Sequence, residues 1–271
     1  MTGRARLSVV LAAPRGAAES EGARPAFLAQ LDTSAGDELI VERDDRGSLL
    51  VPELWSRGIQ KSRGEIVALT LCSMHPDPGW AEALRATFEE GLAGVGGAIE
   101  PASKMRPLDW AIHLARYAAY LLPFPARDVE DLPGDNAAYR RDAIEACRPV
   151  WAEGFWETEV DAWLRRRGQR LRLMPEMVVR QGASVGFLGF CANRIRHGIR
   201  SGRERSERFS LVGRLVRALA FPAAAAVMLR RIGRLASSRG RAEGFRVALP
   251  LLTVFLLFWT AGEGIGYLRG R

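Results

Sequence analysis

The most constraining feature of the sequence is a series of short apolar runs separated by stretches with helical spacing. The runs lie at residues 7–13, 38–41, 65–71 and 95–99 and are rich in β-branched residues. Strands that alternate with helices are typical of βαβ units, which build a mainly parallel sheet. The first part of the chain is therefore predicted to fold as an α/β domain.

Two of the intervening stretches have a clear helical period. One predicted helix begins at Pro78 with Asp77 as its N-cap and places an apolar stripe along residues 80–88. A second carries a stripe along residues 110–121. We interpret both stripes as core packing rather than as a ligand-binding surface. Further along, residues 157–167 are predicted to form a helix and residues 171–179 a strand.

Length and composition narrow the class of protein. The 271 residues and 29.8 kDa accommodate one catalytic-size domain with a short appendage. With 48% hydrophobic and 26% charged residues, the chain is neither disordered nor collagen-like. The cysteines at positions 72, 147 and 191 lie far apart, without C-x-x-C spacing. This argues against a disulfide framework and against a structural zinc site.

The positive charge of the chain is concentrated in one segment. Residues 190–246 contain fourteen arginines and three glutamates, a net charge of +11, so the rest of the chain carries −3 of the total +8. The segment has few aromatic residues and an apolar neighbour, which favours anionic lipid headgroups over nucleic acid as its partner. Nucleic-acid binding and a merely solvated face are the alternatives.

The character of the chain changes near residue 200. Residues 211–229 are apolar but contain arginines and a proline, so we interpret them as an interfacial helix. Residues 248–262 are almost continuously apolar, yet a bilayer crossing needs roughly 20 residues, and extending the segment includes Glu263. This segment is expected to span or re-enter a membrane; a buried helix of a soluble protein is the alternative. The predicted domains are 1–203 and 204–271.

The ends of the predicted strands offer groups for ligand binding. Open α/β sheets bind ligands beyond the carboxyl ends of their strands. The first strand ends at Ala12, Ala13 and Pro14, and the second ends near Glu42 and Asp44. These two carboxylates can accept hydrogen bonds from a base or a ribose. An exposed acidic turn without a ligand is the alternative.

Seven sequence blocks, taken in order, resemble the family 2 glycosyltransferases of the bacterial, membrane-associated type. The blocks are residues 7–14, 37–45, 58–70, 76–80, 95–101, 132–144 and 155–171, and the ending 245–271 is similar to the membrane tails of that family. The resemblance implies the nucleotide-sugar-binding GT-A fold and an inverting sugar transfer, with the catalytic domain on the cytoplasmic face. The expected partners are a nucleotide-sugar donor, membrane lipids, and a lipid-linked or membrane-proximal acceptor, without nucleic acid. A catalytically impaired partner or regulatory subunit is the alternative.

The metal motif of this family is altered. Its members carry an Asp-x-Asp pair that holds a divalent cation, and the matching positions here are Leu71, Cys72 and Ser73. Magnesium and manganese prefer oxygen ligands, which a leucine does not offer. Ser73 and His75 are weak substitute ligands, and Asp77 is equally well explained as a helix cap. The cofactor therefore stays unassigned, with a divalent cation as one option.

The resemblance also assigns roles to individual residues. Counting back from Gly168 places Glu157 at the position of the catalytic base, with Glu159 in reserve; carboxylates favoured by the helix dipole are the alternative for both. Glu42 or Asp44 is expected to contact the nucleotide base, and Ser73 to lie near the donor.

Two further groups of residues receive roles in the same way. The loop at Gly134, Asp135 and Asn136 is expected to contact the donor sugar and the acceptor, unless it opens a helix at Ala137. Arg194 and Arg196 lie where similar proteins carry a basic motif near the diphosphate, and a lipid-facing role is equally supported.

Overall fold

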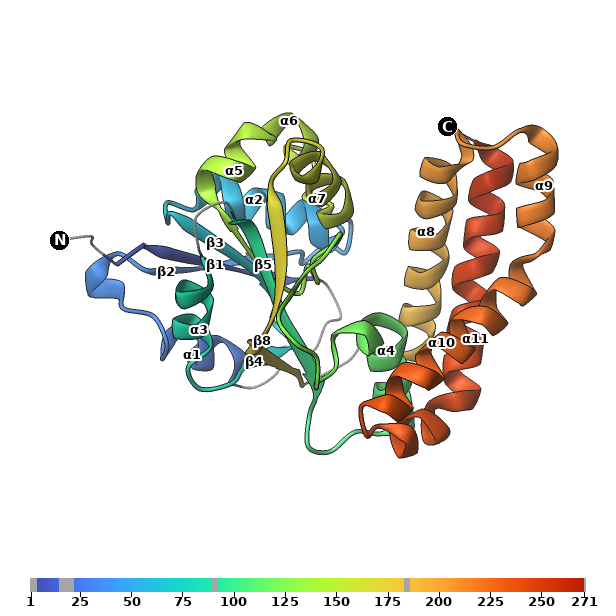
Figure 1. Ribbon diagram of the computed structural model, residues 1–271, viewed down its shortest axis with the longest axis horizontal. Helices are drawn as coiled ribbons and strands as arrows, with labels where there is room; N and C mark the ends of the chain where they lie inside the picture. The colour runs from blue at the N-terminus through green and yellow to red at the C-terminus, as the bar shows by residue number, and fades with distance from the viewer. Residues whose placement is uncertain (1–3, 15–21, 89–91, 183–185, 271) are drawn as a thin grey trace. The chain divides into compact units, whose positions relative to one another are not determined.

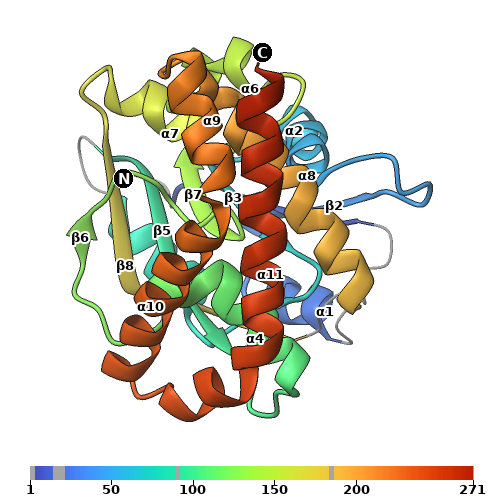
Figure 2. The same ribbon diagram turned by 90° about the vertical axis from the view of Figure 1, so that its right-hand side faces the viewer.

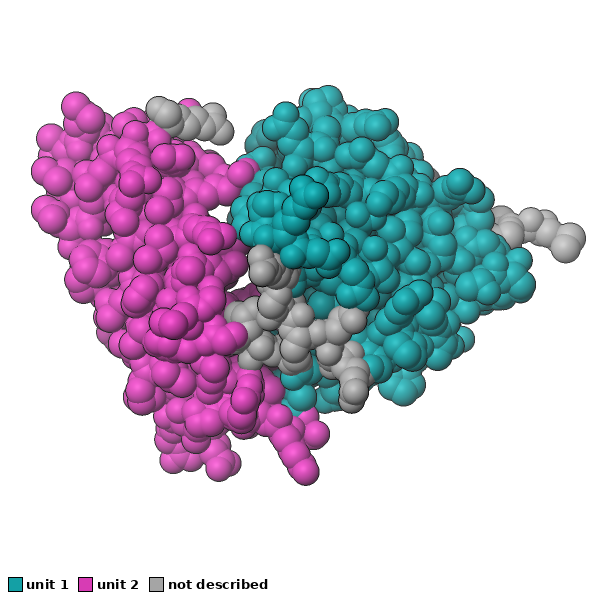
Figure 3. Space-filling view, turned by 180° about the vertical axis from the view of Figure 1, so that it is seen from behind, with its two compact units in different colours: residues 1–102, 120–183 teal, residues 103–119, 184–271 magenta. Residues whose placement is uncertain are grey.

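The computed structural model describes residues 4–14, 22–88, 92–182 and 186–270. The chain divides into two compact units, which Figure 3 distinguishes by colour. Unit 1 comprises residues 1–102 and 120–183, and unit 2 comprises residues 103–119 and 184–271. Unit 2 is thus assembled from two separate stretches of chain, a different division from a single boundary at residue 203.

Unit 1 is built on a mixed sheet of eight strands within the described residues (Figure 1). The strand order is β2-β1-β3-β7-β5-β8-β4, and β6 also pairs with β8. The longest ladders, β1 with β2, β1 with β3, and β5 with β8, are parallel, whereas β7 is antiparallel to both of its neighbours. The strands are β1 (Leu7–Ala13), β2 (Glu38–Arg43), β3 (Ile66–Leu71), β4 (Met74–Pro76), β5 (Leu92–Pro101), β6 (Arg127–Asp128), β7 (Asn136–Arg140) and β8 (Arg170–Gln181).

Helices cover both faces of this sheet. Figure 1 shows α1 and α3 below the sheet and α2, α5, α6 and α7 above it. The helices of unit 1 are α1 (Ala23–Leu28), α2 (Val51–Lys61), α3 (Trp80–Thr87), α5 (Arg141–Ala146), α6 (Arg148–Trp151) and α7 (Glu157–Arg165), with a short 3-10 turn at Thr33–Ala35. A second 3-10 turn, Ala118–Tyr120, lies at the boundary of the two units. The predicted α/β architecture with a mainly parallel sheet and a helical C-terminal tail is confirmed.

Two local predictions are wrong. Helix α3 begins at Trp80 rather than Pro78, because Gly79 adopts a left-handed conformation with φ of 83° as the N-cap. The carboxylate of Asp77 does not cap the helix and instead makes two 2.7 Å hydrogen bonds to Arg180 of β8. In addition, Ala137 lies inside strand β7, so the alternative of a helix opening there is excluded.

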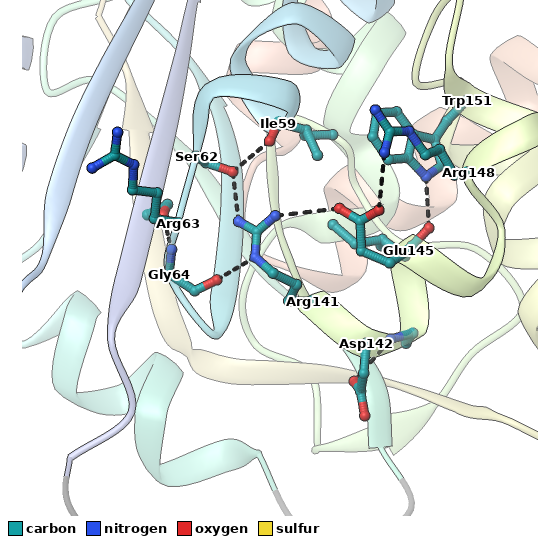
Figure 4. A network of polar contacts seen from close by, with 12 residues as sticks. Ile59, Ser62, Arg63, Gly64, Arg141, Asp142, Glu145, Arg148 and Trp151 are labelled. Carbon is teal, nitrogen blue, oxygen red and sulfur yellow. Dashed lines mark hydrogen bonds and ion pairs between the residues drawn. The ribbon is translucent and has the colours of Figure 1, made fainter.

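A network of polar contacts lies just before the start of β3 (Figure 4). The guanidinium of Arg141, the first residue of α5, donates to the carbonyl oxygen of Gly64 and to Oγ of Ser62, each at 2.6 Å. It also pairs with Glu145 of α5 at 3.4 Å. These contacts tie the connection between α2 and β3 to the start of α5.

Unit 2 consists of helices packed around its last one. They are α4 (Pro107–Tyr117), α8 (Phe187–Ser206), α9 (Leu211–Leu219), α10 (Phe221–Ser238) and α11 (Ala242–Arg269), and α11 contacts each of the others (Figure 2). Trp110 of α4 packs on Gly244, where a Cβ atom would come within 2.7 Å of the indole ring. The guanidinium of Arg239 donates to the carbonyl oxygens of Ala118 and Ala119, which satisfies the end of α4.

Helices α8 and α11 run parallel and meet through glycines. A Cβ atom at Gly198 would lie 2.2 Å from the carbonyl oxygen of Trp259, and one at Gly266 would lie 2.3 Å from that of Ile199. Each helix contributes a pair of glycines four residues apart, Gly198 and Gly202 in α8 and Gly262 and Gly266 in α11. These pairs bring the two backbones into contact, as in small-residue interfaces of packed helices. Glu263, costly to bury alone, accepts hydrogen bonds from Ser201 and Arg205 of α8, each at 2.9 Å.

One helix of the described residues is long and apolar enough to cross a bilayer. This helix is α11, and the bent pair of α9 and α10 would be a second candidate if its two parts formed one broken span. The axes of α9 and α10 differ by 62°.

Candidate functional site

The carboxyl ends of three strands meet at one edge of the sheet. Ala12 of β1 is in register with Glu42 of β2 and with Leu71 of β3. Beyond the strands, the amide of Asp44 donates to the carbonyl oxygen of Ala13 at 3.1 Å, and the amide of Cys72 donates to that of Ala12 at 3.0 Å. The residues predicted from the strand ends, from Ala12 and Ala13 through Glu42 and Asp44 to Ser73, therefore share this edge, and Pro14 follows β1 there.

Both acids at the end of β2 have partners within the protein. The carboxylate of Asp44 accepts hydrogen bonds from the amides of Gly47 at 2.9 Å and Leu49 at 2.8 Å. Burial works to raise the pKa of Asp44, but these amides outweigh it and hold the pKa below its ordinary value. Glu42 pairs with Lys61 of α2 at 2.6 Å. Asp44 thus organises the loop after β2, and the charge of Glu42 is matched by α2.

The end of β3 does not fit a divalent cation. Leu71 and Cys72 are buried, and the described residues contain no group of three or more His, Cys, Asp or Glu side chains able to hold a metal ion. Burial lowers the pKa of His75 in β4, and Asp77 is engaged by Arg180. The carbonyl oxygen of Ser73 accepts a 2.7 Å hydrogen bond from Gly182.

Glu157 is the first residue of α7 and faces the loop before β7. A Cβ atom at Gly134 would lie 3.0 Å from Cδ of Glu157 and 2.9 Å from Cη2 of Trp55. Only a glycine therefore lets the loop pass between the carboxylate and the indole. Nε1 of Trp55 donates to the carbonyl oxygen of Thr70 at 3.0 Å, which fixes the indole over the end of β3. These contacts place Glu157 at the same edge as the strand ends.

A second acid, Asp161, lies one helical turn beyond Glu157 and was not predicted. Its side chain is completely buried and accepts hydrogen bonds from the amide of Leu132 at 2.7 Å and from the hydroxyl of Tyr139 at 2.9 Å. Burial raises the pKa of Asp161 well above its ordinary value, and the nearby charge of Glu157 adds to this shift. Asp161 therefore joins the start of the 132–135 loop to α7.

Further acids surround Glu157. Burial raises the pKa of Asp131. Burial also raises the pKa of Tyr120, and four nearby carboxylates raise it further, namely Glu157, Asp131, Asp161 and Asp135. Glu157, Asp131, Asp135 and Asp161 thus form one acidic cluster. Carboxylates accept hydrogen bonds from hydroxyl groups, which are the polar groups that sugars present.

Two predicted residues have different surroundings. Asn136 is completely buried, and its amide donates to the carbonyl oxygens of Ala98 and Met177, each at 2.9 Å. Its oxygen accepts from Trp80, also at 2.9 Å. Neither amide hydrogen of Asn136 is left for a sugar, so its role is structural. Glu159 is half-buried and lies two residues after Glu157, so it points to another side of α7.

The predicted arginines belong to unit 2. The guanidinium of Arg194 lies over the rings of Phe190 and Trp259, 4.7 and 5.0 Å from their centroids, whereas Arg196 is exposed. Stacking of this kind favours the cation energetically and orients it. The role of both residues near a diphosphate stays a prediction.

Comparison with known proteins informs the fold. Searches with protein-family models and against curated protein sequences gave no match. Among solved structures, the chain is similar to the mannosyltransferase PcManGT from Pyrobaculum calidifontis in complex with GDP-Man and Mn2+, with a TM-score of 0.51 and 16% identity over 93% of this chain and 88% of that one. It is also similar to GalNAc-T7 with UDP, GalNAc and Mn2+, with a TM-score of 0.50 and 11% identity. That match covers 68% of this chain but only 45% of GalNAc-T7.

At 16% and 11% sequence identity, both similarities concern the fold alone. The chain therefore has a GT-A-like glycosyltransferase fold.

Proposed function

We propose that this protein is an inverting glycosyltransferase that uses a nucleotide-sugar donor. The observation that carries the proposal is the position of Glu157, at the start of α7, against the Gly134 loop and at the edge where the strands end. This edge is where open α/β sheets bind nucleotides. A carboxylate there can accept a proton from an incoming hydroxyl group.

In the proposed reaction, Glu157 removes the proton of the acceptor hydroxyl group. The acceptor oxygen then forms a bond to the anomeric carbon of the sugar, while the bond from that carbon to the diphosphate oxygen breaks. The nucleoside diphosphate leaves with the bonding electron pair. Because attack and departure occur on opposite faces of the sugar, the anomeric configuration is inverted. Asp161 positions α7 and the loop through its bonds to Tyr139 and Leu132.

The proposed acceptor is lipid-linked or lies close to a membrane on the cytoplasmic face. Support comes from unit 2, which combines an apolar helix of 28 residues with the arginine-rich segment. An enzyme held at a surface meets substrates of that surface at a high effective concentration. The proposal predicts no role for nucleic acid.

Turnover of the purified full chain tests the proposal. UDP-, GDP- and dTDP-sugars are supplied with membrane lipid extract in detergent, and both nucleoside diphosphate release and the glycosylated lipid are measured. We expect Glu157→Gln to lower turnover at least about a hundredfold, because a positioned base contributes that much. Glu159→Gln, on another side of the same helix, serves as the control and retains activity. Unchanged turnover in Glu157→Gln would remove the base assignment.

The altered end of β3 favours a second candidate, a glycosyltransferase-like partner subunit without turnover. Leu71, which is buried, and Ser73 stand where the family carries its two metal-binding aspartates. This candidate predicts that calorimetry detects binding of a nucleoside diphosphate while no donor sugar is consumed. Consumption of any donor with the lipid extract rejects it.

A further inference from the structure

Helix α9 presents an exposed apolar face. Five large apolar side chains lie at successive i, i+1, i+4, i+5 and i+8 positions and so share one side of the helix. Three of them have exposed fractions of 80%, 73% and 71%, values far above those of side chains that pack in a core. This surface, called the α9 face below, consists of Leu211, Val212, Leu215, Val216 and Leu219.

The opposite side of α9 packs against the rest of unit 2. Ala218 is buried against Gly264 of α11, where a Cβ atom would lie 3.1 Å from the carbonyl oxygen of Ala218. Nε of Arg214 donates to the carbonyl oxygens of Ser206 and Phe209 at 2.9 and 3.1 Å. The guanidinium of Arg217 lies 3.5 Å from the centroid of the Phe209 ring. Both arginines of α9 are therefore turned back onto the protein, and the outward face is left apolar.

Exposed arginines flank the α9 face. Arg208 precedes the N-cap of α9, and Arg269 lies at the end of α11 beside Gly270, where a Cβ atom would lie 3.2 Å from the Arg214 guanidinium. Apolar side chains with cations at their margin match a lipid leaflet, in which acyl chains lie beneath anionic headgroups.

The packing of α11 argues that this contact involves one leaflet. Helix α8 runs parallel to α11 in backbone contact through Gly198 and Gly202. Along that length α8 carries five arginines, at positions 194, 196, 200, 203 and 205. A bilayer crossing by α11 would bring these side chains into the hydrocarbon core or break the glycine contacts, and both changes are costly.

From these observations we infer that the α9 face inserts into one leaflet of a membrane carrying anionic lipids, while α11 stays beside α8 and does not cross. This inference concerns lipid binding alone, so it stands or falls independently of sugar transfer. Of the two topologies open to α11, it favours binding to one leaflet over a helix that spans the bilayer.

Vesicle flotation of the full chain tests the α9 face. The probes are vesicles of phosphatidylcholine with and without phosphatidylglycerol, without donor or acceptor. We expect Leu215→Glu/Leu219→Glu to weaken binding to the anionic vesicles more than tenfold, because two charges replace inserted side chains. The matched control is Leu188→Glu, which changes a side chain that is 79% exposed but lies outside the α9 face. It is expected to float like the wild type.

Flotation of the double variant like the wild type would overturn the inference. A second result would also overturn it: the wild type fails to bind vesicles and forms a dimer without lipid, and the double variant does not dimerise. In that case the α9 face would bind a second copy of the chain. Circular dichroism of each variant checks folding, and because all three substituted side chains are exposed, a folded double variant is expected.

Labelling of the two ends of α11 tests the topology. Glu243→Cys and Arg269→Cys place thiols at exposed positions near the start and end of the helix, whereas the native cysteines are buried. In sealed inverted membrane vesicles from cells that express the full chain, a membrane-impermeant maleimide is expected to label both positions from the same side. Labelling of one position only, with the other labelled after detergent is added, would show a crossing and overturn the one-leaflet assignment.

Discussion

Asp161 is a buried acid within one helical turn of the proposed base. Its two hydrogen bonds, to Leu132 and Tyr139, connect the loop that contains Gly134 to α7. A conventional search for catalytic motifs passes over it, because the position belongs to the apolar side of the helix, between Val160 and Leu164. That placement is the one sequence signal for it, since an acid on a core-facing stripe needs internal partners.

Asp161 should make stability depend on pH. Burial raises its pKa in the folded protein, so its contribution to the free energy of unfolding is fully present below the ordinary carboxyl pKa of about 4 and is lost as the pH rises through the raised pKa. We expect the stability of the wild type relative to Asp161→Asn to fall as the pH rises from about 4 through the raised pKa of Asp161, as measured by urea denaturation.

The neighbouring Thr158 supplies the control for this measurement. It is exposed and does not titrate, so Thr158→Ala should follow the wild-type pH dependence. If Asp161→Asn also followed it, Asp161 would not be the titrating group.

The residues at the end of β3 predict how nucleotide binding responds to metal. Leu71 and Cys72 offer no hard oxygen ligand, and no metal-binding group of side chains occurs elsewhere in the described part of the chain. The affinity for a nucleoside diphosphate, measured by calorimetry, should change by less than about twofold when excess EDTA replaces manganese. A large loss of affinity in EDTA would show that ligands outside this set bind the ion.

At the scale of elements, the sequence predicted those with a strong period. Strand β1 spans the predicted residues, β3 begins one residue later than expected, and α7 begins at Glu157 as predicted. These segments bury continuous apolar runs or one helical stripe, and so their pattern is visible without tertiary information.

Other elements depend on neighbours that a pattern cannot reveal. Strand β7 has five residues, Asn136–Arg140, without a β-branched side chain, and it is stabilised by pairing with β3 and β5. The carboxylate of Asp77 does not cap α3 as predicted, because Arg180, distant in sequence, engages it. For the same reason the amide of Asn136, expected to face a ligand, is used inside the sheet.

The glycines of α8 should respond in opposite ways to alanine. At Gly198 an added Cβ would meet the backbone of α11, so Gly198→Ala should destabilise unit 2 by about 1–3 kcal/mol. At Gly189, with open space around it on the same helix, alanine should stabilise by about 0.5–1 kcal/mol through helix propensity. Thermal unfolding of the two variants checks the sign. A similar shift in both would show that propensity, rather than contact with α11, decides the effect.

At the scale of the whole molecule, charge and apolar surface make separable contributions. The net charge of +11 in residues 190–246 attracts any polyanion, but this attraction is screened by salt. Binding to anionic vesicles should therefore weaken yet persist at about 0.5 M NaCl, whereas a DNA mobility shift should disappear. Complete loss of vesicle binding at high salt would assign the interaction to charge alone.

The assembly of unit 2 from two stretches of chain has a consequence for biosynthesis. Arg239, which satisfies the end of α4, follows Ala118 by 121 residues, and Gly244, on which Trp110 packs, follows later still. During translation α4 therefore leaves the ribosome long before its partners in unit 2 exist. A nascent chain that stops short of α11 therefore lacks the helix on which the indole of Trp110 packs.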